Sequence, residues 1–174
     1  KKKEQDSFFS LKILPNEEFF LWFLADDPVL FYRHWVQSMN RFVICFDAEG
    51  GCDPKICPVC AKFGKEAQLC GAYPVFKYDS RTKEQLASVL ERPFKDIRLI
   101  HDEKKHAGKG TLKDHRILVT TEKGRGGKGV DIRYRSQGIK PLGMDIKLPK
   151  IDKQPMDREQ LVALLGVGTT QTDL

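Results

Sequence analysis

The sequence lacks the signals of membrane insertion and of secretion. No run of apolar residues approaches the roughly 18 that a membrane-spanning helix requires, so we expect no membrane contact. The N-terminal sequence KKKEQDSFFS carries charge but no long apolar region behind it, which predicts that a signal peptide is absent. Both absences favour a reducing, cytoplasmic compartment, where clustered cysteines are more often metal ligands than disulfides.

Motifs of the common catalytic classes are missing as well. The glycine-rich stretch Gly124-RGGKGVD lacks the Gly-x4-Gly-Lys-Ser/Thr pattern of a nucleotide-binding loop. No paired-carboxylate or serine-nucleophile motif is present. His101, His106 and His115 are scattered through a basic stretch, where exposure or phosphate contact is favoured over catalysis. The sequence therefore predicts a binding protein and not an enzyme.

What the chain does contain is a globular composition with an uneven charge. Its 174 residues suffice for one domain, or one domain with an insertion, that buries a core without disulfides. The net charge is +6, but residues 98–150 carry 14 basic and 6 acidic groups while residues 1–97 carry 14 of each. A basic excess confined to one third of the chain predicts a surface that faces a polyanion, although a solvated lysine-rich face would give the same pattern.

Short strands are expected to dominate the secondary structure. Apolar alternation and turn residues predict strands over 9–14, 19–24, 29–36, 41–46, 71–79, 116–123 and 130–136. A capping-box spacing from Thr82 to Gln85 predicts a helix over 82–92, and a second helix is expected over 157–165, before Gly166. Residues 94–100 fit either state. The sum predicts an α+β, mainly β, fold or a small barrel.

One histidine and four of the five cysteines lie between residues 34 and 60. Cys57-Pro-Val-Cys60 has the spacing of a zinc knuckle, in which two thiolates hold one ion from a tight turn. The strands 29–36 and 41–46 flank Ser38-Met39-Asn40 and form a plausible hairpin. Pairing Val36 with Val43 in that hairpin places His34 opposite Cys45 on the same face.

These four side chains make a Cys3His set for one structural Zn²⁺: His34, Cys45, Cys57 and Cys60. Cys52 is an alternative to His34, and Cys70 is expected to be a small buried hydrophobic residue. A thioredoxin-like redox pair is disfavoured because this Cys-x-x-Cys follows a glycine- and aspartate-rich loop and not a strand. A deaminase-like catalytic zinc is disfavoured because no glutamate follows His34.

Aromatic and basic residues alternate around the expected hairpin. The segments are Phe31-Tyr32-Arg33-His34-Trp35, Arg41-Phe42 and, later, Lys77-Tyr78. Single-stranded nucleic acid is bound by such a combination, because bases stack on rings while cations contact phosphates. Phe31, Arg33 and Trp35 are expected on the face opposite His34, whereas the aromatic residues of 19–23 are expected to fill a sheet.

At these positions the chain resembles a known family, the single-stranded DNA-binding proteins of tailed bacteriophages, related to the helix-destabilising protein of T-even phages. The resemblance covers roughly residues 8–140 and is carried by Leu14-PNEEFFLWFLADD, Tyr32-Arg33-His34-Trp35-Val36, Cys45, Cys57-Pro-Val-Cys60 and Lys123-GRGGKGVDIRY. It implies an OB-fold barrel with a zinc-bearing insertion and a basic cleft for single-stranded DNA. It also implies that His34, Cys45, Cys57 and Cys60 are the metal ligands.

The chain departs from the family at two places. Cys52 is an additional cysteine, and the last 24 residues have a net charge of −2, so the long acidic tail that recruits replication partners is short, missing or truncated. The resemblance matches Lys1-Lys2-Lys3 to the basic arm that such proteins use for cooperative self-association on DNA. The implied location is the cytoplasm of a host cell.

The sequence thus predicts a basic arm (1–7), an OB-fold domain (8–150) with a zinc subdomain at about 31–70, and a C-terminal helix and tail (151–174). The expected function is sequence-nonspecific binding of single-stranded DNA in phage replication, recombination or repair. The expected DNA contacts are Arg33, Trp35, Arg41, Phe42, Lys77, Tyr78, Lys123, Arg125, Lys128, Arg133 and Tyr134. The alternative is a zinc-ribbon phage protein that modulates host transcription or recombination machinery through protein contacts.

Overall fold

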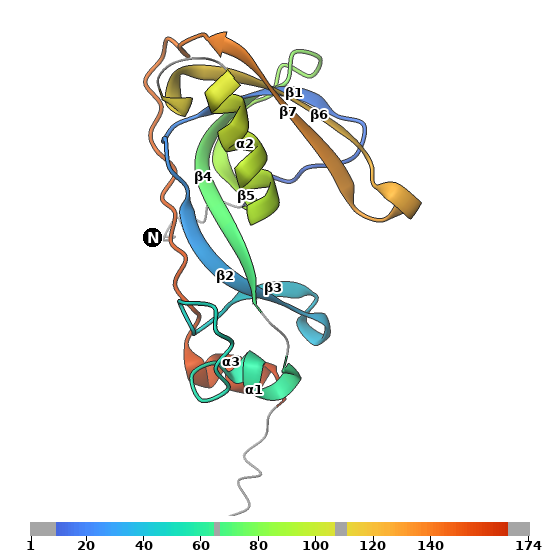
Figure 1. Cartoon of the computed structure of the whole chain (residues 1–174), viewed down its shortest axis with the longest axis vertical. Helices are drawn as coiled ribbons and strands as arrows, with labels where there is room; N and C mark the ends of the chain where they lie inside the picture. Colours follow the sequence, from blue (N-terminus) through green and yellow to red (C-terminus); the bar gives the residue numbers. More distant parts are fainter. Residues whose placement is uncertain (1–9, 65–66, 107–110, 167–174) are drawn as a thin grey trace, which may run out of the picture. The chain divides into compact units, whose positions relative to one another are not determined.

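A computed structural model describes residues 10–64, 67–106 and 111–166, and these residues form a mainly β structure (Figure 1). The strands are β1 (Glu18–Phe23), β2 (Val29–Val36), β3 (Arg41–Ile44), β4 (Gln68–Tyr78), β5 (Gln85–Pro93), β6 (His115–Lys123) and β7 (Val130–Ile139). The helices are α1 (Pro58–Phe63), α2 (Phe94–His106) and α3 (Arg158–Leu164), with short 3-10 turns η1 (Gln37–Met39), η2 (Leu112–Asp114) and η3 (Arg125–Gly127). The strands form one antiparallel sheet in the order β3-β2-β4-β1-β6-β7, with β5 paired to β4, which confirms the α+β, mainly β, prediction.

The chain divides into two compact units. The first, here called the sheet unit, comprises the described residues up to Val29 and Gly71–Ile151. The second, the hairpin unit, comprises Leu30–Cys70 and the described residues from Asp152 to Gly166. The hairpin unit thus contains the residues 31–70 expected to form the zinc subdomain, together with α3. The expected basic arm (1–7) lies outside the described residues.

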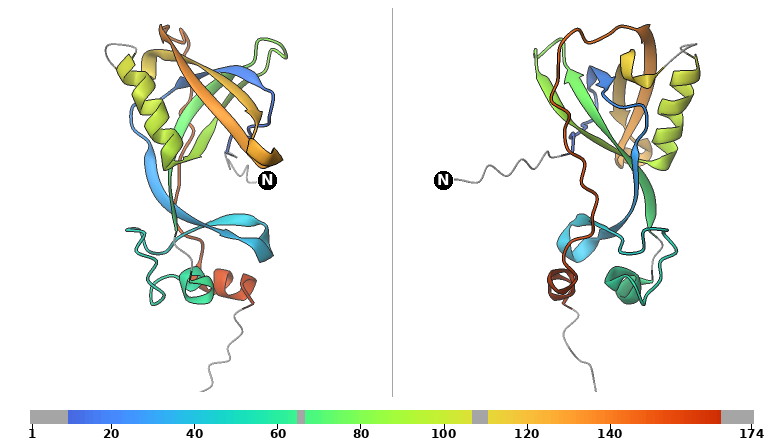
Figure 2. Two further views of the ribbon diagram at one scale, coloured as in Figure 1. Left: turned by 45° about the vertical axis from the view of Figure 1, so that its right-hand side comes forward. Right: turned by 90° about the vertical axis from the view of Figure 1, so that its left-hand side faces the viewer.

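The sheet unit contains β1, β4, β5, β6 and β7, in the order β5-β4-β1-β6-β7. Alternate residues of β1 enter its core, so that Phe19, Leu21 and Phe23 are buried as period-two patterning requires. Helix α2 adds Ile97 and Ile100 to the same core. Figure 2 shows β6 and β7 as a long hairpin with α2 beside the strands.

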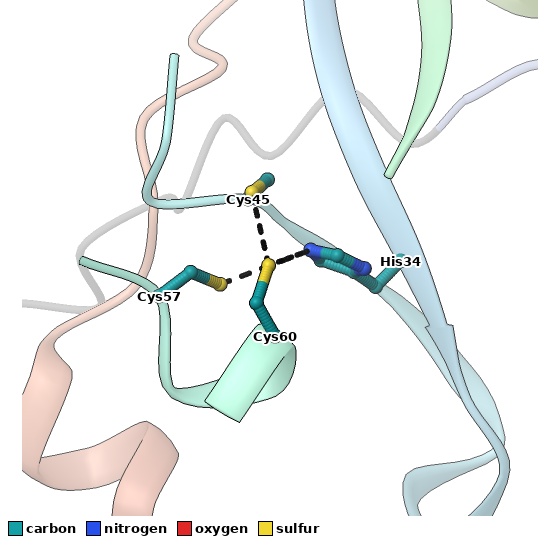
Figure 3. A group of neighbouring side chains, drawn as sticks. All are labelled: His34, Cys45, Cys57 and Cys60. Atoms are coloured by element: carbon teal, nitrogen blue, oxygen red, sulfur yellow. Dashed lines mark hydrogen bonds between the residues drawn. The ribbon is translucent and has the colours of Figure 1, made fainter. Parts of the chain in front are cut away.

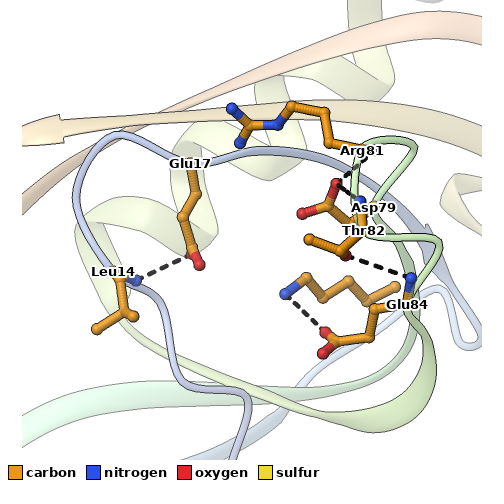
Figure 4. A network of polar contacts seen from close by, with 7 residues as sticks. Leu14, Glu17, Asp79, Arg81, Thr82 and Glu84 are labelled. Carbon is orange, nitrogen blue, oxygen red and sulfur yellow. Dashed lines mark hydrogen bonds and ion pairs between the residues drawn. The ribbon is translucent and has the colours of Figure 1, made fainter.

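The helix expected over 82–92 is wrong, because these residues form the turn before β5 and the strand itself. Asp79 closes the β4–β5 turn: its carboxylate accepts from the backbone N–H of Arg81 (2.8 Å) and of Thr82 (3.2 Å), and its N–H donates to the Glu84 carbonyl (3.0 Å; Figure 4). The Thr82 hydroxyl accepts from the Glu84 N–H at 3.3 Å. It therefore stabilises a turn and does not cap a helix.

Other expectations for the sheet unit are met in part. Residues 94–100, which fitted either state, begin α2. Leu11 and Ile13 pack against the core as expected, but the segment makes only an isolated parallel bridge between Ser10 and Val89 and no strand. Phe9 lies outside the described residues.

The hairpin unit is built on β2 and β3, which pair across η1. Asn40 has a φ of 48° and ends this turn in the left-handed conformation that asparagine tolerates. The register differs from the expected one by two residues, because Val36 pairs with Arg41 and His34 with Val43. A shift of two keeps every side chain on its face, so His34 still shares a face with Cys45.

The face of the hairpin that contains His34, Val36 and Cys45, here called its inner face, carries the core of the unit. Its buried members come from the hairpin, from the knuckle segment and from α3, and they are Val36, Val43, Cys45, Cys57, Val59, Cys60, Leu161 and Leu165. Helix α3 begins one residue after the expected start, because Asp157 is its N-cap and its carboxylate accepts from the Gln160 N–H at 3.0 Å. Helices α1 and α3 lie side by side (Figures 1 and 2).

Candidate metal centre and binding surfaces

Four side chains of the hairpin unit converge and could hold a metal ion. They are His34, Cys45, Cys57 and Cys60, all buried, with their ligand atoms within 4.8 Å of one another (Figure 3). The Sγ atom of Cys60 lies 3.4 Å from His34 Nε2 and 4.0 Å from the Sγ atom of Cys45. The Sγ atom of Cys57 lies 3.8 Å from His34 Nε2. The Cys3His set predicted from spacing is thus brought together.

Each ligand is positioned by a different local structure. His34 projects from the middle of β2, and Cys45 follows the end of β3, where its N–H donates to the Tyr32 carbonyl at 2.9 Å. Cys57 precedes α1 and Cys60 lies in its first turn, because Pro58 at the first helical position starts the helix immediately after Cys57. The two cysteines therefore face the hairpin from one short turn.

The cluster favours a thiolate at one position. Burial raises the pKa of the Cys57 thiol, but its hydrogen bond to His34 and those from the N–H groups of Cys60, Phe46 and Val59 outweigh burial and lower that pKa to about 6. Burial raises the pKa of Cys45 to about 11, and burial also raises the pKa of Cys60. A cation entering this site would displace protons from the thiols, as metal binding to cysteine does.

The remaining cysteines fall outside the cluster. Cys52, the alternative to His34, is half-buried and packs at the edge of the hairpin core, and the group that could bind a metal contains His34 instead. Cys70 is buried, as expected of a small hydrophobic residue. No disulfide links cysteines in the described part of the chain.

The outer face of the hairpin carries an exposed group of aromatic and basic side chains. Trp35 and Phe42 are cross-strand partners with ring centroids 5.0 Å apart, and they are 46% and 44% exposed. The Arg33 guanidinium lies over the Phe42 ring, 3.7 Å from its centroid. Three of the expected DNA contacts thus form one group, called here the hairpin platform. Arg41 is exposed but pairs with Val36 and so lies on the other face.

Tyr32 lies on the metal side of the hairpin, on the same face as His34. It packs against the hairpin core, and its ring occupies the space where a side chain at Gly50 would project. Gly50 has a φ of 74°, so the position demands glycine for its backbone as well as for this contact. Tyr32 is therefore a packing residue.

In the sheet unit, the expected basic residues of the β6–β7 tip are exposed. Lys123, Arg125 and Lys128 surround a turn whose residues Gly126, Gly127 and Gly129 all have positive φ, and Figure 1 shows this tip extending away from α2. The glycines let the turn close while three cations remain in solvent. Arg133 is also exposed, on β7.

Two expected contacts are placed in the interior instead. Lys77 is buried on the core face, where it pairs with Glu84 at 3.0 Å and lies over the Phe19 ring. Tyr134 is a core residue, and its hydroxyl donates to the Asp96 carboxylate at 3.0 Å. Strand alternation directs both side chains inward, where each is buried.

Tyr78 is half-buried on the outer face, and its neighbours were missed by sequence reasoning. Its cross-strand partner is Phe20, and the Arg116 guanidinium lies 4.7 Å from the Phe20 centroid. Arg135, the partner of Leu118 on β7, is exposed on the same face. The signal was present: with Phe19 and Leu21 inward, alternation places Phe20 outward, and the same pattern in β6 places Arg116 beside it.

No helix among the described residues is long and apolar enough to cross a membrane. Compared with protein-family models, with curated proteins and with solved structures, the chain gives no match in any of the three.

Proposed function

We propose that this protein binds single-stranded DNA without sequence preference, through an OB-fold braced by one structural Zn²⁺, in phage replication, recombination or repair. In this proposal the cations contact phosphates and the exposed rings stack on bases.

The order of the strands in the sheet unit supports the OB-fold. An OB-fold is a five-stranded, partly open Greek-key barrel. Here β1 pairs with β4 and β6, β4 pairs with β5, and α2 joins β5 to β6. With β1, β4, β5, β6 and β7 counted as the five strands, β2, β3 and α1 of the hairpin unit lie in the connection between the first and second strands of the fold.

The observation that carries the proposed function is where the exposed cations and rings fall along this topology. In OB-folds, the connections between strands one and two and between strands four and five bind oligonucleotides. The hairpin platform of Arg33, Trp35 and Phe42 lies in the first of these connections. Lys123, Arg125 and Lys128 surround the second. Both ligand-binding connections thus carry the side chains that single strands require.

The donor set and its distances support zinc as the metal. Three thiols and an imidazole are ligands that Zn²⁺ prefers, and ligands at about 2.0–2.3 Å from a tetrahedral ion lie roughly 3.5–3.8 Å apart. Three of the six separations are 3.4, 3.8 and 4.0 Å, and all six lie within 4.8 Å. With four protein ligands no position is open for a substrate, so a bound Zn²⁺ would cross-link β2, β3 and α1 and hold the hairpin platform in place.

Binding to fluorescent single-stranded and duplex oligonucleotides of one sequence and length tests the function. We expect tighter binding to the single strand, little change when its sequence is permuted, and a fall in affinity with salt of about 0.7 in log–log slope per phosphate contacted. Preference for the duplex, or no binding to either, would refute the proposal and favour the protein-binding alternative.

A further inference from the structure

The connection between β7 and α3 contains a segment with the pattern of a strand that forms no strand. From Leu142 to Leu148 every second residue is apolar, which is the alternation of a strand covered on one face. Residues 140–157, all of which the structure describes, belong to no helix or strand (Figure 1). No described residue forms a hydrogen bond with the backbone of residues 141–148. Their N–H and C=O groups can therefore pair with another strand.

The apolar residues of this segment are only partly covered by the sheet unit to which they belong. Leu142 and Ile146 are half-buried and, with Trp22, line a groove of about 570 Å³. Met144 and Leu148 line the same groove but are 52% and 58% exposed. An extended segment that combines exposed apolar side chains with an unpaired backbone is a template for another chain.

The length of a ladder on this segment is limited at both ends. Pro141 and Pro149 have no N–H group, so neither can donate to a ladder. Gly143 has a φ of 72°, and the chain bends at Met144. The residues that can pair are therefore Met144-Asp145-Ile146-Lys147-Leu148, here called the pairing segment.

The pairing segment is complementary to a second copy of itself in the antiparallel direction. If Ile146 lies opposite Ile146 of the second copy, Met144 lies opposite Leu148 and Asp145 lies opposite Lys147. Two-fold symmetry repeats both of these pairs. Asp145 and Lys147 are both exposed, and opposite charges placed across two strands stabilise the pairing.

Charge also selects this register over its neighbours. A register centred on Asp145 places two carboxylates opposite each other, and one centred on Lys147 places two ammonium groups opposite each other. Like charges in these positions are destabilising. The register centred on Ile146 avoids both and brings apolar residues of the two copies together.

We propose that two copies of this protein form a two-fold dimer by antiparallel pairing of Met144–Leu148. The ladder satisfies backbone groups of both copies, and Met144 and Leu148 of each copy cover those of the other. The contact requires neither DNA nor residues 1–7, so it is separate from any self-association on a DNA strand. A ladder of five residues is a small interface, and the dimer is therefore expected to dissociate on dilution.

Charge reversal tests the pairing without removing an apolar contact. Sedimentation equilibrium without DNA, over a range of protein concentrations, should show wild-type protein approaching twice the monomer mass. Asp145→Lys and Lys147→Asp each place like charges at both symmetric pairs, so each should raise the dissociation constant of the dimer about 4- to 900-fold. The control Asp102→Lys makes the same charge change on the exposed side of α2 and should leave the dissociation constant within about twofold of wild type.

A mixture of the two variants separates lost pairing from lost folding. A pair made of one Asp145→Lys copy and one Lys147→Asp copy has opposite charges at both positions again. The 1:1 mixture should therefore dimerise about as tightly as wild type, and so should the double variant Asp145→Lys/Lys147→Asp.

Three results would overturn the pairing. They are a wild-type protein that stays monomeric at its highest soluble concentration, a dimer that neither charge reversal weakens, and a mixture of the two variants that stays monomeric. Each would exclude a second copy as the partner of the pairing segment. Because no DNA is present, none of these results decides the proposed function.

Discussion

Truncation of Leu161 tests whether α3 is part of the metal-binding structure. Leu161 is fully buried in the hairpin core, beside Val36, Val43 and the three cluster cysteines. Replacing a buried leucine with alanine costs about 2–5 kcal/mol in the free energy of unfolding. A unit of this size rarely gains more than about 3–5 kcal/mol from its core alone, so the loss is comparable to its whole metal-free stability.

Coupling between folding and binding converts that loss into metal affinity. If the hairpin unit is unfolded without metal, Zn²⁺ binding must also drive its folding. A substitution that makes folding less favourable then makes the free energy of Zn²⁺ binding less favourable by the same amount. The apparent dissociation constant for Zn²⁺ should then rise about 30- to 4,000-fold in Leu161→Ala. Leu164→Ala is the control, because Leu164 lies in the same helix and is 48% exposed. Its affinity should change by no more than about twofold.

Competition with a chromophoric chelator measures both affinities, and hydrogen exchange measures which residues lose protection. We expect Leu161→Ala to expose amides of β2, β3 and α1 in the presence of chelator, while β1 and β6 of the sheet unit stay protected. Equal Zn²⁺ affinities for the two variants would refute the reasoning, because they would show that the metal centre folds without α3.

Three further outcomes follow from the placements above. Metal analysis of purified variants should show that Cys57→Ser and His34→Ala lose bound Zn²⁺ and that Cys52→Ser retains it. Full Zn²⁺ occupancy in His34→Ala would show that another residue is the fourth ligand. In a salt titration with single-stranded DNA, Arg125→Ala and Lys128→Ala should each reduce the log–log slope by about 0.7, and an unchanged slope would remove the tip from the binding surface. Denaturant unfolding of Tyr134→Phe should show that the free energy of unfolding falls by about 1–3 kcal/mol, because the buried Asp96 carboxylate loses one hydrogen-bond donor and keeps only Arg92 at 2.8 Å. The affinity for oligonucleotides should not change. Weaker DNA binding at unchanged stability would show instead that Tyr134 contacts DNA.

Much of the sheet could be predicted because its strands alternate strongly. The run from Phe19 to Phe23 has inward and outward positions of different exposure, and the glycine-rich tip marks the β6–β7 turn. The turn before β5 and β5 itself could not be predicted in the same way. Its Thr82 and Gln85 fit a helix cap, and Leu86, Val89 and Leu90 fit a helical stripe. Pairing with β4, whose Asp79 closes the turn, overrides that local preference.

The four residues of the metal cluster could be predicted from the sequence, because neither the spacing of the cysteines nor the face on which a side chain lies changes when the strand register is wrong by two residues. The expected pairing of Val36 with Val43 was wrong by two residues, and His34 nevertheless shares its face with Cys45. The packing of α3 against the metal cluster could not be predicted, because the sequence of residues 157–165 does not indicate which residues Leu161 and Leu165 contact. For the same reason Lys77 and Tyr134 were misplaced: a basic or aromatic residue in a strand does not reveal which face is covered.

The two-part composition of the hairpin unit has a consequence for synthesis of the chain. The last residue of the metal cluster, Cys60, leaves the ribosome about a hundred residues before Leu161 and Leu165, which at about 5–20 residues per second is an interval of roughly 5–20 s. During that interval the thiols are complete as a ligand set but lack the helix that covers their core. The sheet unit, whose last core strand ends at Ile139, can fold in the meantime. Cells that synthesise this protein under oxidising or metal-poor conditions should therefore accumulate thiol-modified nascent chains before they accumulate unfolded sheet units.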